Sequence, residues 1–284
     1  MNHATFRGPI LRIRSHHVIG TFMILCAILW LVPIYYLVIN AFKPLRDVVM
    51  RTAQFPTSFY LDNFAAVWKN MNYPQLLFNS FFVTVGSVAL TVLFCSMAGY
   101  KLARMSGKSA NLFLLYFLLA MVIPFQAIMV PLVKLMSDLK LSNSLFGLIV
   151  LYLAIEAPIA IYLYYGAAKA IPTSLEESAR IDGASQLRTF FSVIFPLLRP
   201  MTGTVIILTS LWIWNDFLIP LILLSDPAKK TLPLGTTAMF FGTYMNKWNL
   251  GITAILMASL PMIILFFVMQ KHIVKGITAG SVKG

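Results

Sequence analysis

Long stretches without any charged side chain set the strongest limit on how this chain can fold. Four windows of the sequence contain no Asp, Glu, Lys or Arg, and two more contain a single acid each. Every window is long enough for the roughly 20 apolar residues that a helix needs to cross a bilayer. The charge-free windows are residues 15–42, 70–100, 109–133 and 248–270, and the windows with one acid are 141–168 and 200–225. The sequence therefore predicts six transmembrane helices.

The composition supports the same fold class, an all-α polytopic membrane protein. Only 11% of the residues are charged and 59% are hydrophobic, whereas a soluble globular domain has about a quarter charged residues. The net charge of +13 is spread over short loops and forms no single basic face, which favours a topological role over nucleic-acid binding. Cys26 and Cys95 lie inside apolar windows, and neither they nor the four histidines have metal-ligand spacing, so we expect no metal site.

Lysine and arginine placement predicts the orientation of the helices. With six crossings, the side that holds the amino terminus carries the larger share of these residues, so we place that side and both termini in the cytoplasm. The expected organisation is a cytoplasmic basic tail over residues 1–17, a six-helix transmembrane domain over 18–272, and a cytoplasmic tail over 273–284. A loop over residues 171–200 belongs to the transmembrane domain.

That loop, between the fourth and fifth windows, carries the signals of a helix start. Ser174 and Glu177 have the S-x-x-E spacing of a capping box, and Thr173 and Glu176 repeat it one residue earlier. Acidic side chains here would also face the positive end of the helix dipole. We expect a short helix to begin at this point.

The helix should end in a sharp turn and be followed by a second helix. Gly183 suits a left-handed bend, and Ser185 can cap a second segment that ends near Pro196. The result is a helix–turn–helix elbow that stays outside the bilayer. Its compact shape suits docking into a groove of a partner protein, although a hairpin that merely links two spans would have the same pattern.

The elbow resembles the loop found in the membrane subunits of ATP-binding-cassette importers. The loop pattern of that family is EAA, three residues, Gly, nine residues, then I-x-L-P. Here it reads Glu177, Ser178, Ala179, then Gly183, then Val193, Ile194, Phe195 and Pro196. Ser178, Val193 and Phe195 depart from the pattern, but the spacing is intact. The short sequences IDGA and KGITAGSVKG are similar to those of maltose-type carbohydrate permeases, so the resemblance extends over essentially the whole chain.

This resemblance implies a type I importer fold and a noncatalytic permease subunit of an ATP-driven, binding-protein-dependent importer of a carbohydrate, with an oligosaccharide as cargo. The implied partners are a second permease subunit, two cassette ATPase subunits and an extracytoplasmic substrate-binding protein. ATP and Mg would be bound by the ATPase subunits, and no cofactor by this chain. The implied location is a bacterial or archaeal cytoplasmic membrane.

The resemblance also assigns two contacts with the ATPases. Residues expected to couple to them in the elbow are Glu176, Glu177, Ser178, Ala179, Arg180, Asp182, Gly183 and Pro196. The small-residue tail would approach the same subunits near Lys275 and Gly276.

Polar residues inside the windows are candidates for a translocation path. They are Asn79, Gln126, Glu156, Asn215 and Asp216. A carboxylate at mid-membrane costs about 2.5 to 3.5 kcal/mol on insertion scales, so Glu156 and Asp216 should face protein or water. Prolines in the third and fourth windows predict broken helices of the kind that line a cavity. Structural hydrogen bonding remains the alternative for Glu156, and packing against a partner helix is the alternative for Asn215 and Asp216.

The loop between the fifth and sixth windows is rich in aromatic residues. The resemblance implies that it reaches toward the substrate-binding protein, and the alternative is a loop at the lipid interface. The candidate docking residues are Phe240, Phe241, Tyr244 and Trp248.

Two other function classes remain to be weighed. Glu156 and Asp216 would also suit an ion- or proton-coupled secondary carrier, but that class leaves the elbow unexplained, and the chain shows no matched repeats. A membrane enzyme lacks support because no Ser-His-Asp constellation or H-E-x-x-H pairing occurs. As an alternative cargo, a glycerol-phosphate-like polyol would call for a cation in the cavity, which the apolar windows do not contain.

Overall fold

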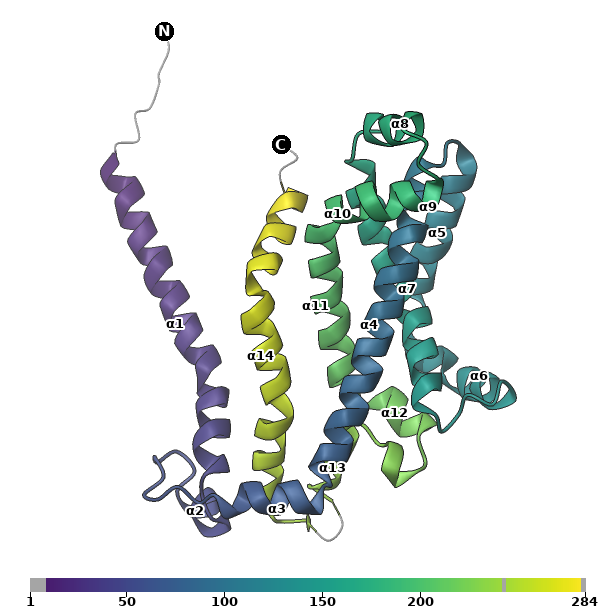
Figure 1. The fold of residues 1–284 in the computed structure, drawn as a ribbon. Coiled ribbons are helices and arrows are strands. Elements are labelled where there is room, and N and C mark those ends of the chain that lie inside the picture. Colours follow the sequence, from purple (N-terminus) through teal and green to yellow (C-terminus); the bar gives the residue numbers. More distant parts are fainter. Residues whose placement is uncertain (1–8, 242–243, 282–284) are drawn as a thin grey trace. The chain divides into compact units, whose positions relative to one another are not determined.

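The computed structural model describes the backbone of residues 9–241 and 244–281, and the side chains of residues 18–241 and 244–270. All regular structure in this part of the chain is helical (Figure 1). The chain divides into two compact units. Unit 1 contains residues 1–67 and 239–257, and unit 2 contains residues 68–238 and 258–284.

The helices follow one another without a strand between them in the described ranges. Unit 1 holds α1 (Pro9–Ala41), α2 (Leu45–Met50) and most of α3 (Asp62–Asn70). Unit 2 holds α4 (Tyr73–Arg104), α5 (Lys108–Val122), α6 (Phe125–Asp138), α7 (Leu145–Lys169), α8 (Ser174–Ile181), α9 (Gln186–Thr189), the π-helix η1 (Phe190–Ile194), α10 (Phe195–Leu197), α11 (Arg199–Asn215), α12 (Leu218–Leu223), the 3₁₀-helix η2 (Pro227–Lys229) and α13 (Leu232–Ala238). Helix α14 (Trp248–Ser281) begins in unit 1 and ends in unit 2.

Four of these helices are long and apolar enough to cross a membrane as single spans. They are Val18–Ala41, Tyr73–Arg104, Leu145–Lys169 and Trp248–Gln270. Two more spans are broken. Lys108–Val122 and Phe125–Asp138 meet at 100°, and Gln186–Leu197 and Arg199–Asn215 meet at 77°. When each bent pair counts as one span, the prediction of an all-α protein with six spans is confirmed.

Proline explains the break in the third span. Helix α5 has 15 residues, about 22 Å at 1.5 Å per residue, and ends just before Ile123. Pro124 disfavours a helical conformation at Ile123, which adopts an extended backbone instead. The prediction of a proline break is therefore confirmed at Pro124. It is wrong for the fourth window, because Pro158 lies inside the continuous helix α7 (Leu145–Lys169), and Pro131 likewise lies inside α6. The bend is sharper than a kink, and α6 leaves the direction of α5 altogether.

The centre of unit 2 is the pair α4 and α7, which lie side by side (Figure 1). Their backbones come unusually close at Gly99. A Cβ atom there would lie 2.6 Å from the Cβ of Tyr164 and 2.9 Å from the carbonyl oxygen of Ile161. No side chain larger than hydrogen fits this contact without moving α7. Glycine therefore sets the spacing of the two helices.

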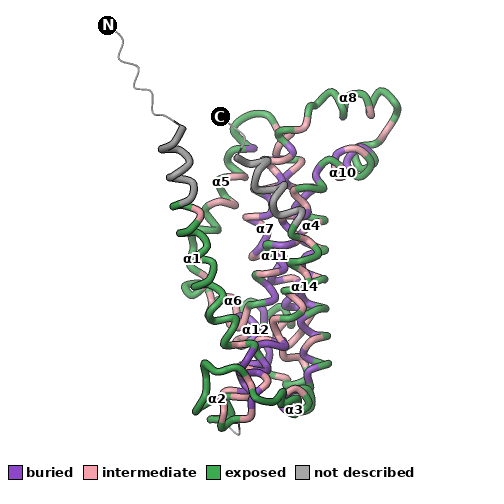
Figure 2. The backbone as a smooth tube through the Cα atoms, turned by 90° about the vertical axis from the view of Figure 1, so that its left-hand side faces the viewer, coloured by how far each residue is buried: buried purple, intermediate pink, exposed green. Residues whose placement is uncertain are grey.

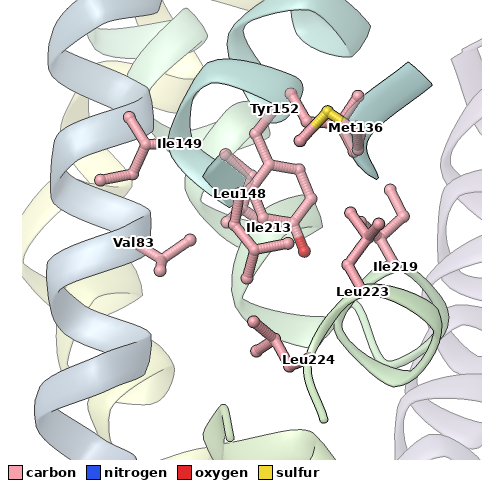
Figure 3. Packing of buried hydrophobic residues seen from close by; sticks show 10 residues of the cluster. Val83, Met136, Leu148, Ile149, Tyr152, Ile213, Ile219, Leu223 and Leu224 are labelled. Carbon is pink, nitrogen blue, oxygen red and sulfur yellow. The ribbon is translucent and has the colours of Figure 1, made fainter. Parts of the chain in front are cut away.

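Two apolar clusters fill unit 2. One gathers Leu148, Ile149 and Tyr152 of α7 with Val83 of α4 and Ile213 of α11 (Figure 3). The other lies nearer the elbow and includes Cys95, Ala160, Ile161, Tyr164, Phe190, Ile194, Leu198 and Val205. Buried backbone runs along α7 and α4, whereas the α8 loop is largely exposed (Figure 2). The α8 part of the elbow is thus attached to unit 2 through few buried residues.

Candidate functional site

The elbow has the predicted shape. Helix α8 ends at Ile181, and Gly183 follows with φ +80, the left-handed conformation that favours glycine. Two hydrogen bonds close the turn: Gly183 N donates to Arg180 O at 3.0 Å, and Ala184 N donates to Ala179 O at 2.9 Å. This pair of bonds is the Schellman arrangement, in which the orphan carbonyls at a helix end are satisfied.

The second predicted helix start is confirmed, and the first is partly wrong. Ser185 caps α9, its Oγ accepting from Arg188 N at 3.3 Å. Helix α8 does begin at Ser174, but the capping boxes do not form: the N-cap residue is Thr173, with a helical backbone and no side-chain hydrogen bond. In the Thr173 box, the carboxylate of Glu176 is occupied elsewhere, which explains why that box stays open.

Glu176 is buried and joins the elbow to α4. The residue is 4% exposed, and each of its carboxylate oxygens has a partner. Arg104 Nε donates to Oε1 at 2.5 Å, and Tyr100 Oη donates to Oε2 at 2.8 Å. Arg104 also donates from Nη2 to the carbonyl oxygen of Ile171 at 2.8 Å. We call these four residues, Glu176, Arg104, Tyr100 and Ile171, the elbow clamp.

The other side of the elbow is exposed and carries large apolar side chains. Ile181 is 86% exposed, Leu187 60% and Leu175 41%. Four of the predicted coupling residues, Glu177, Ser178, Arg180 and Asp182, are exposed around them. Apolar side chains grouped on a charged, solvent-facing knob are typical of a protein–protein contact. The sequence interpretation missed Ile181 and Leu187, although their apolar character within a charged insert was the available clue.

The second half of the elbow is anchored by apolar contacts. Phe190 and Ile194 of η1 are buried, and the ring of Phe190 lies 5.4 Å from that of Tyr100. Pro196 is half-buried in α10, just before the 77° bend into α11. The π-helix places Phe190 and Ile194 against the bundle while Leu187, at the start of the same segment, stays in solvent. Both halves of the elbow are therefore fixed on one side and open on the other.

Asp216 does not lie inside a helix, as the window pattern predicted, but in the break between α11 and α12. Its Oδ1 accepts from Leu218 N at 2.9 Å and caps α12, while its Oδ2 accepts from Tyr152 Oη at 2.8 Å. Neighbouring Asn215 is exposed and donates to Leu211 O at 2.7 Å. The two residues border a hollow of about 530 Å³ whose lining is Leu208, Leu211, Trp212, Asn215 and Asp216.

The other three candidates for the translocation path lie apart from this hollow. Glu156 is 7% exposed and has Thr209 as its hydrogen-bond partner. Asn79 Nδ2 donates to the carbonyl oxygens of Ala228 and Lys230, at 2.8 Å each, and so holds the loop around η2 against α4. Gln126 is exposed on α6. The structure therefore brings together only Asn215 and Asp216 of the five.

The candidate docking residues of unit 1 form a small aromatic group. The rings of Phe240 and Trp248 lie 6.1 Å apart, and Lys247 lies 5.4 Å above the ring of Tyr244. Phe241 is exposed beside them. The predicted tail contacts Lys275 and Gly276 have side-chain positions outside the described residues.

A buried lysine in unit 1 was not anticipated. Lys43 follows the end of α1, is 1% exposed, and donates to Asn40 Oδ1 at 3.0 Å, Arg51 O at 2.9 Å and Thr52 O at 3.1 Å. Burial lowers the pKa of Lys43 below its usual value, and the nearby Asp47 carboxylate opposes that shift. The lysine fastens the end of α2 to the end of α1. No sequence pattern distinguished it from an ordinary loop lysine.

Among the residues that the structure describes, no three His, Cys, Asp or Glu side chains group as a metal site would require.

Comparison with protein families identifies the family of this chain. The family model of the binding-protein-dependent transport system inner membrane component matches residues 91–279, which include the elbow, α11 and α12. The chain belongs to this family. Together with the relatives described next, this match confirms the resemblance to permease subunits of carbohydrate importers.

Curated relatives match the permease over nearly its whole length. The probable starch degradation products transport system permease protein AmyC of Thermoanaerobacterium thermosulfurigenes is 39% identical, over 92% of this chain and 94% of that protein. The multiple sugar-binding transport system permease protein MsmG of Streptococcus mutans is 37% identical, over 90% and 93%. The melibiose/raffinose/stachyose import permease protein MelC of Bacillus subtilis is 34% identical, over 96% and 99%.

Solved structures share the fold. A chain of a bacterial ABC transporter involved in the import of the acidic polysaccharide alginate matches with a TM-score of 0.77 and 24% identity, covering 95% of the permease and 99% of that chain. A chain of the alginate transporter in complex with an alginate pentasaccharide-bound periplasmic protein matches with a TM-score of 0.63 and 15% identity, covering 92% and 96%. The expected importer fold is consistent with both.

Proposed function

We propose that the permease is the noncatalytic translocation subunit of an ATP-driven importer of oligosaccharides. A cassette ATPase docks on the exposed face of the elbow, and its closure on ATP is converted into alternating access of the membrane path. ATP and Mg²⁺ are bound by the ATPase subunits. The elbow and both termini face the cytoplasm, and the aromatic group of unit 1 faces the substrate-binding protein.

The exposed apolar face of the elbow carries this proposal. Leu175, Ile181 and Leu187 would cost free energy in water if no partner covered them, since burial of a large apolar side chain is worth about 1.5 to 3 kcal/mol. The elbow stays folded without a partner because Glu176 and Phe190 hold its other side. A fixed knob with an apolar tip suits docking in a groove of another subunit.

The relatives support a neutral oligosaccharide as cargo. Their names specify starch degradation products, multiple sugars and the melibiose, raffinose and stachyose group. The hollow beside α11 is lined by apolar, amide and acidic residues and contains no lysine or arginine, which argues against a phosphorylated polyol. A second permease subunit would complete the path, because six spans are few to enclose a sugar.

The test is a charge placed on the docking face. Ile181→Asp should abolish co-purification of the ATPase and lower sugar-stimulated ATP hydrolysis at least tenfold in proteoliposomes, because a contact hot spot is worth about 2 kcal/mol or more. Ser192→Asp is the matched control, since Ser192 is exposed on η1 and gains the same charge. Full stimulation in the Ile181→Asp complex would contradict the proposal. Uptake by the permease alone, without an ATPase, would instead support an ion- or proton-coupled carrier.

A further inference from the structure

Glu176 is the one predicted coupling residue that a docking partner cannot reach. It is 4% exposed, while Glu177, the next residue, is exposed. Two adjacent carboxylates in the same helical turn therefore have different surroundings. Building on the proposed function, we propose that Glu176 is a positioning residue. The elbow clamp holds α8 and α4 rigidly together, so that displacement of the docked elbow also moves the transmembrane helix α4.

The clamp is built for rigidity. The Glu176 carboxylate is held by Arg104 through one oxygen and by Tyr100 through the other, so rotation of the side chain would break at least one bond. Its bond with Arg104 is charge-assisted, and both side chains are shielded, with 16% exposure for Arg104 and 6% for Glu176. A buried ion pair with all its bonds made is costly to separate, because either charge alone would be left desolvated.

Arg104 fastens a second point of the chain. Its Nη2 donates to the carbonyl oxygen of Ile171, in the short connection between α7 and α8. The guanidinium thus bridges the last turn of α4, the connection that enters the elbow, and α8 itself. A movement of α8 cannot be taken up by the connection alone, since the same arginine holds both segments.

The clamp also lies beside a close contact between α4 and α7. Tyr100 follows Gly99, where the α4 backbone contacts Ile161 and Tyr164 of α7. Tyr164 is fully buried, so the two helices cannot slide past each other at this level without repacking. The displacement is therefore delivered to the pair α4 and α7 together, which forms the centre of unit 2. A two-point physical connection of this kind can carry a displacement from the elbow to these two helices.

The experiment separates docking of the ATPase from transmission of the elbow's displacement to α4. It measures the number of ATP molecules hydrolysed per sugar molecule transported. Glu176→Gln keeps the shape of the side chain and removes the charge that pairs with Arg104. The complex should still assemble with its ATPase and hydrolyse ATP, but transport should fall about tenfold, so that the ratio of hydrolysis to transport rises by the same factor. Lys101→Gln is the control: it also removes a charge from α4 near the clamp, but from an exposed side chain that the clamp does not use, and it should leave this ratio unchanged.

Tyr100→Phe serves as a second variant that removes one hydroxyl group and leaves the ion pair intact. It should raise the ratio by a smaller factor, about threefold, and it keeps the inference testable if Glu176→Gln is not inserted into the membrane. Exchange of the charges, Arg104→Glu with Glu176→Arg, should recover part of the lost coupling relative to either single change. A residue with a merely structural role would show reduced insertion without this change in ratio.

An unchanged ratio in both Glu176→Gln and Tyr100→Phe would overturn the inference. The proposed function would survive that result as long as Ile181→Asp still prevents docking. Conversely, if Ile181→Asp leaves hydrolysis and assembly intact, the elbow is not the docking site, and the proposed function fails independently of the clamp.

Discussion

The elbow and the break between α11 and α12 are two joints between helices, and each is held by a hydrogen bond between a tyrosine and a carboxylate. In each, the hydroxyl of a tyrosine on a long helix donates to a carboxylate at 2.8 Å, Tyr100 to Glu176 and Tyr152 to Asp216. The partner of the other carboxylate oxygen differs between the two joints. Glu176 uses it for a guanidinium, whereas Asp216 uses it for the first backbone N–H groups of α12. The first joint therefore ties two separate helices together, and the second also sets where a helix begins.

The surroundings of the two joints differ as well. The elbow exposes Ile181 and Leu187 to solvent on the side away from its clamp. The break at Asp216 adjoins the apolar cluster that contains Tyr152, Ile213 and Ile219 (Figure 3). A joint with an exposed apolar face can receive a partner. The break at Asp216 is packed on the side of Tyr152 and borders the hollow beside α11 on another.

Gly183→Val should have the largest effect, because it removes the conformation on which the elbow depends. A β-branched residue at φ +80 costs on the order of 1 to 3 kcal/mol locally, and the two hydrogen bonds of the turn would be lost or moved. Sugar uptake in proteoliposomes should fall more than tenfold, while the permease is still inserted.

Two controls make that result specific. Gly183→Asn should retain much of the uptake, because asparagine tolerates the left-handed conformation. Gly166→Val places the same side chain at a glycine of α7 with ordinary helical geometry, where an added Cβ atom would meet nothing within 4 Å. Normal uptake by Gly183→Val would show that the bend is dispensable.

The sequence predicted the local turns of the elbow well and its three-dimensional contacts poorly. Gly183 and Ser185 were identified from local backbone preferences, which need only neighbouring residues. The clamp joins Glu176 to residues more than 70 positions earlier, Tyr100 and Arg104. No local pattern contains that information, so Glu176 was assigned to the docking surface with its neighbours.

Gly99→Val is the next largest change, and it tests the helix pair behind both joints. The added side chain would overlap the Cβ of Tyr164 and the backbone of Ile161, which is a form of overpacking that costs about 1 to 3 kcal/mol or more. The free energy of unfolding in detergent should fall by that amount, and the ratio of ATP hydrolysed to sugar transported should rise. Gly166→Val is again the control. Unchanged stability would mean that α4 and α7 can separate easily. The inference that the elbow's displacement reaches both helices would then be contradicted.

Tyr152→Phe and Tyr100→Phe form a matched pair that compares the two joints directly. Tyr152 is 1% exposed, so loss of its hydroxyl leaves a shielded carboxylate oxygen without its donor, at a cost of about 1 to 3 kcal/mol in the free energy of unfolding. Tyr100→Phe should cost less, about 1 kcal/mol, because Glu176 retains Arg104. Its effect should instead fall on coupling. Equal losses of stability in the two variants would remove the distinction between the joints.

The transmembrane region shows the same division between local and distant information. Apolar windows with at most one charged residue predicted six spans, and Pro124 predicted a break, because both follow from the chemistry of nearby residues in the sequence. The break at Asp216 was not predicted. The surrounding window is mostly apolar, and one of the partners that position the Asp216 carboxylate is Tyr152, 64 residues away.

The smallest expected effect comes from two serine N-caps, one in the elbow and one in the bundle, whose hydrogen bonds have the same length. Ser185 Oγ accepts from Arg188 N and Ser144 Oγ from Gly147 N, each at 3.3 Å. Ser144→Ala should lower the free energy of unfolding by about 1 kcal/mol, because α7 is part of the packed centre of unit 2. Ser185→Ala removes an equivalent bond from an exposed segment that can open by itself. Global stability should then hardly change, while hydrogen exchange of the α9 amides should accelerate about fivefold. If the two variants lost equal global stability, the elbow would unfold only together with the bundle, and its joint would be no more independent than the one at Asp216.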